Sequence, residues 1–186
     1  MQEQRLITGQ TEEAICQQLA EDMQQHPDLL QYQVLLQQAP YQVLFRLDVD
    51  LGGGFESGIS STLFSATLQK SSGYRFRLQQ QGLLEEVGKL LGMQDIKIGD
   101  SEFDAHTLVQ ANQEEKVKQM LSQPDVRSPF LQLSDYQVEL TLPGEANEPA
   151  RLDFWIQEAI TDPIQLCQLY HSFMALLKFS ETDQAL

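Results

Sequence analysis

Several segments of the chain alternate apolar and polar residues, and this pattern limits the fold more than any other feature of the sequence. In residues 41–50, the odd positions from Val43 to Val49 are apolar, and the residues between them are mostly polar. Successive side chains of a strand point to opposite faces of its sheet. The pattern therefore predicts strands of an antiparallel-type sheet with one buried face. The same alternation recurs at residues 59–69, 74–79, 136–142 and 152–156.

Two segments of the N-terminal half have the periodicity of amphipathic helices. Residues 11–25 begin at Thr11, whose hydroxyl can cap a helix, and two glutamates follow at the positive end of the helix dipole. Their apolar residues recur every four positions from Ile15 to Met23, which predicts one buried stripe. Residues 80–91 carry a leucine-rich face that suits packing on a core, and Gly92 is a typical helix stop. We therefore predict helices over both ranges.

Two further helices are predicted in the C-terminal half. Asn112, with Glu115 three residues later, resembles a capping box and predicts a helix that ends near Leu121. The last helix is expected to begin at Asp162 as N-cap, with Pro163 in the first helical position. Its apolar residues cover more than one side, so we expect it to be covered either by the rest of the chain or by another molecule.

The order of these elements lacks the regular strand–helix alternation of a doubly wound sheet. We predict an α+β fold, with an antiparallel-rich sheet and helices packed mainly on one face, in a single domain over residues 1–186. Glycine-bearing turns at residues 52–54 and 71–73 predict that the first three strands form a meander. Residues 29–39 fit a helix as well as a strand, and the sequence leaves the strand order open.

The chain is strongly acidic, which limits the partners it can bind. Its 12 lysines and arginines against 27 acidic residues give a net charge of −15. Binding to nucleic acid or to an anionic membrane depends on clustered cations, so we expect neither as a partner. The charge serves solubility, and it also favours attraction to a basic protein partner.

The two cysteines, Cys16 and Cys167, each lie in an apolar helical stripe. We predict reduced, buried thiols that pack in the core, because there is neither a CxxC pair nor a multi-cysteine framework. The first residues lack the basic start and apolar run of a signal peptide, and no segment approaches the roughly 18 apolar residues of a membrane span. These features predict a cytoplasmic protein with no membrane contact.

The sharpest local feature is an acidic cluster, which consists of Asp100, Glu102, Asp104 and His106. In an extended segment these side chains would project from one side, where they could bind a divalent metal or act as acid and base. The alternative is a structural turn that starts at Gly99 and Asp100, in which Asp104 caps backbone groups and Phe103 fills the core. We favour the structural turn and predict no bound cofactor.

The segment around the acidic cluster resembles an uncharacterised bacterial protein family. Residues 96–104 read I-K-I-G-D-S-E-F-D, residues 109–112 read V-Q-A-N, and Leu121 and Arg127 follow. The family carries an I-x-I-G-D-x-x-F-D run and then a V-x-x-N step into a helix that ends in leucine. The resemblance covers residues 74–140, and it implies a shared local fold but no known activity and no functional residue.

No motif in the sequence marks an enzyme. The run Gly52-Gly53-Gly54 lacks the lysine and hydroxyl residue of a phosphate loop, and neither a nucleophile elbow nor a histidine-pair motif occurs. We predict a non-enzymatic acidic interaction or binding protein, with a homodimer through the C-terminal helix as one option. The alternative is a metal-dependent enzyme or small-ligand binder that uses the acidic cluster.

Overall fold

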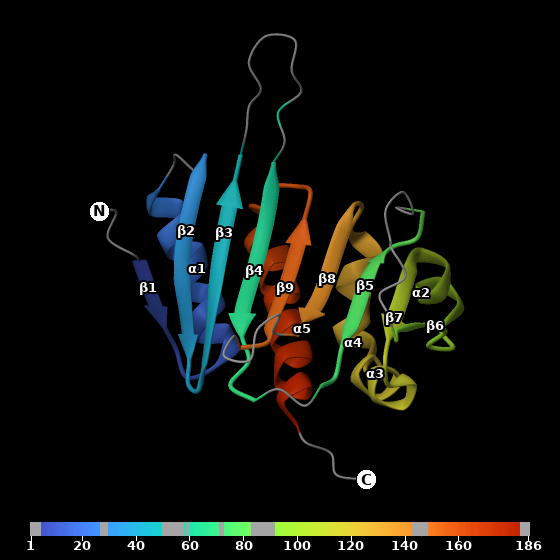
Figure 1. The fold of residues 1–186 in the computed structure, drawn as a ribbon. Coiled ribbons are helices and arrows are strands. Elements are labelled where there is room, and N and C mark those ends of the chain that lie inside the picture. Colours follow the sequence, from blue (N-terminus) through green and yellow to red (C-terminus); the bar gives the residue numbers. More distant parts are fainter. Residues whose placement is uncertain are drawn as a thin grey trace.

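The computed structural model describes residues 5–26, 30–49, 58, 60–70, 73–82, 92–142 and 149–182. Within these ranges the strands form one nine-stranded sheet, in the order β1-β2-β3-β4-β9-β8-β5-β7-β6. The helices lie behind the sheet in Figure 1, and the face turned to the viewer, here named the open face, carries no described helix. The predicted α+β fold, with an antiparallel-rich sheet and helices mainly on one face, is confirmed.

The first four strands of the sheet come from the N-terminal part of the chain. They are β1 (Arg5–Thr8), β2 (Gln31–Gln38), β3 (Tyr41–Asp48) and β4 (Ser61–Thr67). The range 29–39, which fitted a helix or a strand, therefore holds a strand. Strand β1 was not predicted, because four residues are too few to show an alternation. It pairs with β2 in parallel, and every other neighbouring pair is antiparallel.

The remaining strands show that the predicted meander is only partly right. They are β5 (Phe76–Gln80), β6 (Gln94–Ile96), β7 (Thr107–Ala111), β8 (Tyr136–Thr141) and β9 (Arg151–Ile156). Strands β3 and β4 pair as expected, but β4 pairs next with β9, and β5 pairs with β8 and β7. The C-terminal hairpin β8–β9 is thus inserted between β4 and β5. Alternation within a strand tells which face is buried but not which strand lies alongside.

The two long helices begin where the sequence predicted. Helix α1 (Glu12–Gln25) follows Thr11, whose hydroxyl accepts a hydrogen bond of 3.2 Å from the Ala14 backbone amide. Helix α5 (Pro163–Glu181) follows Asp162, whose carboxylate accepts one of 2.8 Å from the Gln165 amide. Both predicted N-caps are confirmed. Among the described residues, no helix has the length and hydrophobicity needed to cross a membrane.

The short helices correct one prediction. They are α2 (Ser101–His106), α3 (Glu114–Met120), α4 (Pro124–Arg127) and the 3₁₀ helix η1 (Ser128–Gln132). The capping box predicted at Asn112 is wrong, because its side chain accepts a hydrogen bond from the Arg75 amide and donates one to the Gly73 carbonyl, at 2.9 and 2.8 Å. The Asn112 side chain thus links the end of β7 to the segment that precedes β5 and does not cap α3. Of the helix predicted over residues 80–91, Gln80 belongs to β5 and the next two residues form a turn. Residues 83–91 lie outside the described residues.

The core lies between the sheet and the helices. Phe64 of β4 packs against Phe45 of β3 and Phe173 of α5, with ring centroids 5.0 and 5.8 Å away. Helix α5 contacts the sheet, α1, α3, α4 and η1, so the rest of the chain covers its apolar sides. Of the predicted core residues, Leu84 and Val87 lie outside the described residues, and the others are fully buried: Phe45, Phe76, Val138, Phe154, Phe173 and Leu177.

Candidate interaction surface

The acidic cluster lies at α2, and the helix separates its members. An extended segment would have put the side chains of this cluster on one side. The extended conformation is wrong, because residues 101–106 are helical. Asp100 is the N-cap of α2. Its Oδ1 accepts hydrogen bonds of 3.2 Å from the amides of Glu102 and Phe103, and its Oδ2 lies 2.9 Å from Arg127. These bonds, led by that from the Phe103 amide, lower the pKa of the Asp100 carboxyl below its usual value.

Asp104 closes the turn in front of this helix. Its two carboxylate oxygens accept hydrogen bonds from the amides of Ile98 and Gly99, at 2.8 and 3.0 Å. Gly99 has a φ of +95°, a conformation that residues with a Cβ rarely adopt. Phe103 is fully buried and contacts Phe130. The carboxylates of Asp100 and Asp104 thus bind backbone amides of their own segment.

His106 contacts other residues than Asp100 and Asp104. Its Nε2–H donates to the carbonyl oxygen of Leu133 at 3.0 Å, and its ring stacks on Tyr136. Over the part of the chain that the structure describes, no group of three or more histidine, cysteine or acidic residues is placed to hold a metal ion. The four members of the acidic cluster are therefore not assembled as a metal centre in this structure.

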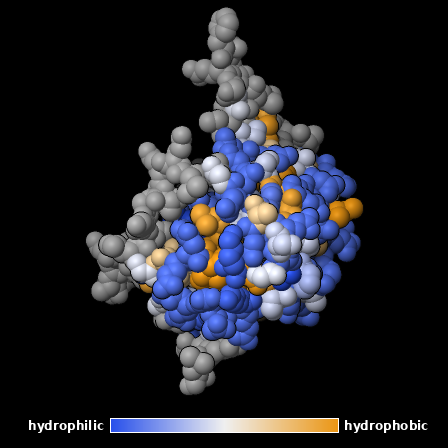
Figure 2. All heavy atoms as spheres, turned by 90° about the vertical axis from the view of Figure 1, so that its right-hand side faces the viewer, coloured by the Kyte–Doolittle hydropathy of each residue, from blue (hydrophilic) through white to orange (hydrophobic). Residues whose placement is uncertain are grey.

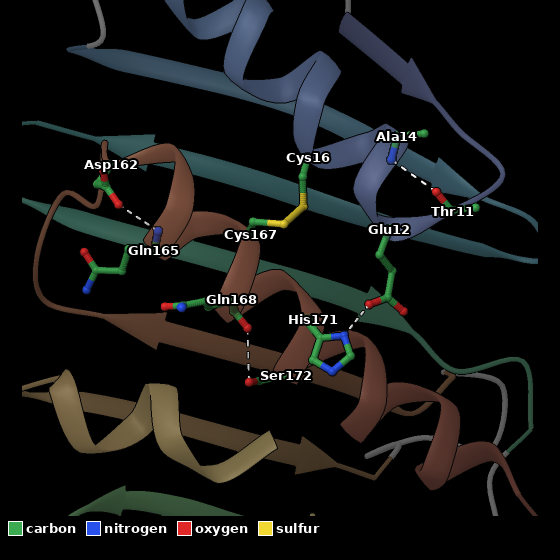
Figure 3. Close-up of a disulfide and its surroundings, with 10 residues drawn as sticks. All are labelled: Thr11, Glu12, Ala14, Cys16, Asp162, Gln165, Cys167, Gln168, His171 and Ser172. Atoms are coloured by element: carbon green, nitrogen blue, oxygen red, sulfur yellow. Dashed lines mark hydrogen bonds and ion pairs between the residues drawn. A yellow bond between two sulfur atoms is a disulfide. The ribbon is translucent and has the colours of Figure 1, made fainter. Parts of the chain in front are cut away.

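The two cysteines form a disulfide, so the prediction of reduced, buried thiols is wrong. Cys16 of α1 and Cys167 of α5 are bonded with their Cα atoms 5.4 Å apart, and both are half-buried (Figure 3). Helices α1 and α5 pack against each other, and this packing brings together cysteines that are 151 residues apart in sequence. Helical periodicity showed that each cysteine lies on a packed side of its helix, but it could not show that the two helices are neighbours.

Glu12 strengthens the same contact between α1 and α5. Its carboxylate forms an ion pair with Lys178, and His171 Nδ1 lies 2.7 Å from its other oxygen (Figure 3 shows the histidine). Helix α1 is thus joined to α5 by a covalent bond and by charged side chains. This contact holds the helix layer in place behind β1–β4.

The open face carries an apolar patch over its first half. Leu6, Leu35 and Leu44 lie side by side on β1, β2 and β3, and Leu63 lies beside Trp155 on β4 and β9. Leu6 is 54% exposed and the other four are half-buried. We name these five residues the apolar patch. The sequence pattern did not predict this patch, although Leu44, which interrupts the alternation of β3, is a signal of it.

Polar side chains occupy the second half of the open face. Nη2 of Arg77 on β5 lies 2.8 Å from each carboxylate oxygen of Glu139 on β8, and Gln137 donates to the same carboxylate. At the border with the first half, Asp153 of β9 accepts hydrogen bonds from Ser65 at 2.6 Å and Arg151 at 2.7 Å. The charges of Arg77, Glu139 and Asp153 are therefore paired within the sheet.

The cations of the chain are largely engaged by its own carboxylates. Because acidic residues outnumber basic ones by 27 to 12, these ion pairs use up cations and leave a surplus of negative charge. The described residues that form such pairs are Arg5, Arg46, Arg77, Lys118, Arg127, Arg151 and Lys178.

The end of the molecule near β6 and α2 differs from the apolar patch. Figure 2 shows this end as mostly hydrophilic, with apolar atoms in a few separate places. Scattered apolar groups are normal on a protein surface, whereas a contiguous apolar patch marks an interaction site. The apolar patch of the open face is therefore the stronger candidate for a binding surface.

Comparison with known proteins adds a fold likeness but no family. No protein-family model matches the chain, and no curated protein matches it. The crystal structure of the mycobacterial trehalose monomycolate transport factor A, TtfA, is similar with a TM-score of 0.47 and 10% sequence identity. The likeness covers 79% of this chain and 70% of that chain.

Proposed function

We propose that the protein is a non-enzymatic acidic interaction protein, whose open face binds a basic protein partner. The apolar patch carries this proposal, because it places the row Leu6, Leu35 and Leu44 and the pair Leu63 and Trp155 on a sheet face that no described helix covers. The burial of such a patch by a partner removes apolar area from water and stabilises the complex. The surplus negative charge favours a basic partner by long-range attraction.

The other predicted partners have less support. The apolar sides of α5 are covered by its own chain, so a homodimer through this helix is not needed to explain its composition; its exposed large apolar residue is Ile164. Absence of nucleic-acid binding stays a prediction from the charge. A metal-dependent activity at the acidic cluster is not proposed, because the carboxylates of Asp100 and Asp104 bind backbone amides.

The cellular location also stays a prediction. The sequence predicted the cytoplasm, but the Cys16–Cys167 disulfide argues against it, because disulfides persist mainly in oxidising compartments. Cell fractionation, with free thiols blocked by alkylation at lysis, decides the question. A chain recovered in the cytoplasmic fraction with both thiols alkylated would contradict an oxidising location.

The proposed function is tested by affinity capture with matched variants. Leu63→Asp places a charge in the apolar patch, whereas Leu108→Asp places the same charge on β7, a half-buried open-face position in the polar half. We expect wild type and Leu108→Asp to retain the same basic protein, which rising salt releases, and Leu63→Asp to lose it. Equal capture by both variants, or a captured set without a basic protein, would contradict the proposal.

A further inference from the structure

A hollow opens on the open face beside the β2–β3 turn. It has a volume of about 540 Å³, which lies within the roughly 300–1,000 Å³ typical of small-molecule sites. It lies at the ends of β2, β3 and β4 where the chain turns between β2 and β3, at the bottom of the sheet in Figure 1. The described residues that line it are Leu35, Pro40, Tyr41, Gln42, Leu44, Ser65, Ala66, Thr67, Leu68 and Gln69.

The lining combines an apolar floor with an uncharged polar rim. Leu35 and Leu44, which are directly paired across β2 and β3, supply the floor. Gln42, Ser65 and Thr67 line the hollow too, and the Ser65 hydroxyl, which donates to Asp153 at 2.6 Å, is left to accept a hydrogen bond from a ligand. None of the described lining residues carries a charge at neutral pH, although 21% of the chain is charged.

The walls of the hollow are fixed by contacts within the chain. The side-chain amide of Gln69 donates a hydrogen bond of 3.0 Å to the carbonyl oxygen of Pro40, which ties the end of β4 to the β2–β3 turn. The backbone amide of Gln69 donates to Glu181 of α5 at 2.6 Å. A rim held from two sides keeps its shape before a ligand arrives, which reduces the entropy lost on binding.

We propose that this hollow binds a small uncharged molecule with an apolar body and a hydroxyl or amide group. The floor would bury the apolar body, and the glutamine, serine and threonine groups would satisfy the polar group, which must keep its hydrogen bonds when it leaves water. A carboxylate or phosphate would meet no cation in the described lining and would be repelled by a chain of net charge −15. The floor shares Leu35 and Leu44 with the apolar patch, and the probes and variants below test the hollow without the protein partner proposed above.

The test uses three probes with the same six-carbon chain: 1-hexanol, hexanoate and hexylammonium. Each is titrated into the ¹⁵N-labelled protein, and amide shifts are followed. We expect 1-hexanol to cause saturable shifts at Leu44, Ser65 and Thr67. Hexanoate should bind at least about tenfold more weakly, because its charge must be desolvated without a partner. Hexylammonium should give shifts spread over the acidic surface that salt removes.

Two variants at the flanks of Arg151 provide the matched control. Thr67 and Thr141 are both exposed, and both are paired with Arg151, on β4 and β8 respectively, but only Thr67 is among the described lining residues. Thr67→Phe should fill the hollow and abolish the 1-hexanol shifts, whereas Thr141→Phe should leave them unchanged. A second variant, Leu44→Thr, removes part of the apolar floor and should weaken 1-hexanol several-fold.

The outcomes are decisive in both directions. Saturable 1-hexanol binding that is lost in Thr67→Phe and kept in Thr141→Phe supports the site. Absence of saturable shifts at the hollow, equal binding of hexanoate, or unchanged binding in both Thr67→Phe and Leu44→Thr overturns it. Because affinity capture of a basic protein uses Leu63→Asp and not these variants, failure here leaves the protein-partner proposal standing, and the reverse also holds.

Discussion

The two halves of the open face meet water in different ways. Over β1–β4 and β9 the half-buried side chains include the apolar patch, whereas over β8, β5 and β7 they form an ion pair and hydrogen bonds that the chain itself satisfies. The Arg77–Glu139 pair needs no partner, although Arg77 Nε, Gln79 Nε2 and Gln110 Oε1 of this half are buried without a hydrogen bond among the described residues. The apolar half exposes surface whose burial would be favourable, and so it is the half where a binding role is expected.

The largest expected effect concerns the disulfide behind the apolar half. We expect Cys16→Ser with Cys167→Ser to lower the free energy of unfolding by about 2–5 kcal/mol, because the bond closes a long loop in the unfolded chain. Hydrogen exchange should rise most in α1 and β1–β3 and least in β5 and β7. Wild type in dithiothreitol should match the variant. A melting temperature that neither the variant nor the reductant changes would contradict this.

The next effect concerns the ion pair of the polar half. Arg77→Met should lower the free energy of unfolding by about 1–3 kcal/mol, because it leaves the Glu139 carboxylate, whose side chain is 20% exposed, without its cation. Arg46→Met is the control, since the Arg46–Asp48 pair of the apolar half is 45% and 37% exposed. It should cost less than about 1 kcal/mol in urea unfolding. If both variants lost the same free energy of unfolding, the ion pairs of the two halves would not differ in their contribution to stability.

The turn before α2 provides a third test, at the edge of the polar half. Asp104→Ala should lower the free energy of unfolding by about 1–2 kcal/mol, the scale of a lost cap, because the amides of Ile98 and Gly99 lose their acceptor. Melting with and without Mn²⁺, Mg²⁺ and Zn²⁺ should show no metal-induced shift in either protein. A variant of unchanged stability that loses a metal shift seen in wild type would restore the metal-site alternative.

Asp100 gives this turn a defined pH dependence. Its pKa is lower in the folded chain than in the unfolded chain, so its ionised form stabilises the fold. That contribution is fully present above the unfolded pKa of about 3.9 and is lost as the pH falls through the lower folded value. Asp100→Asn should therefore melt below wild type at pH 6, and the gap should narrow below about pH 4. A gap that stays constant down to pH 2 would contradict the ionic role.

The smallest expected effect is on the apolar patch itself. Leu63→Ala should change the free energy of unfolding by less than about 1 kcal/mol, because Leu63 lies on the open face. The same change at the fully buried Leu47, on the other face of the neighbouring strand, should cost about 2–5 kcal/mol. A large loss at Leu63 would mean that the patch serves folding and is not available to a partner.

The sequence predicted features within one segment well, but it did not predict which strands and helices lie next to one another. Capping chemistry placed the starts of α1 and α5, because Thr11 and Asp162 act on amides only a few residues away. Alternation identified the buried side of β3, with Phe45 in the core. The place of β5 in the sheet and the Cys16–Cys167 bond depend on contacts between distant segments, and one sequence without pairing information does not contain them.

The candidate surface was missed for a related reason. Leu44 is an exception to alternation, but the other members of the apolar patch, such as its cross-strand partner Leu35, come from other strands. Each is an ordinary residue in its own segment, and the patch exists only after the strands are placed in register. Conversely, the members of the acidic cluster are close in sequence but diverge in space, because a helix turns successive side chains by about 100°.

The position of the β8–β9 hairpin affects the chain while it is being synthesised. Strands β4 and β5 are complete once residue 80 has been made, yet the strands that pair with their facing edges end at residue 156. Until the hairpin emerges from the ribosome, both edges present unpaired backbone groups, which are templates for pairing with other chains. A nascent chain stalled before residue 136 would therefore be prone to aggregation. The C-terminal hairpin is the last part of the sheet to be made, and it joins β4 to β5.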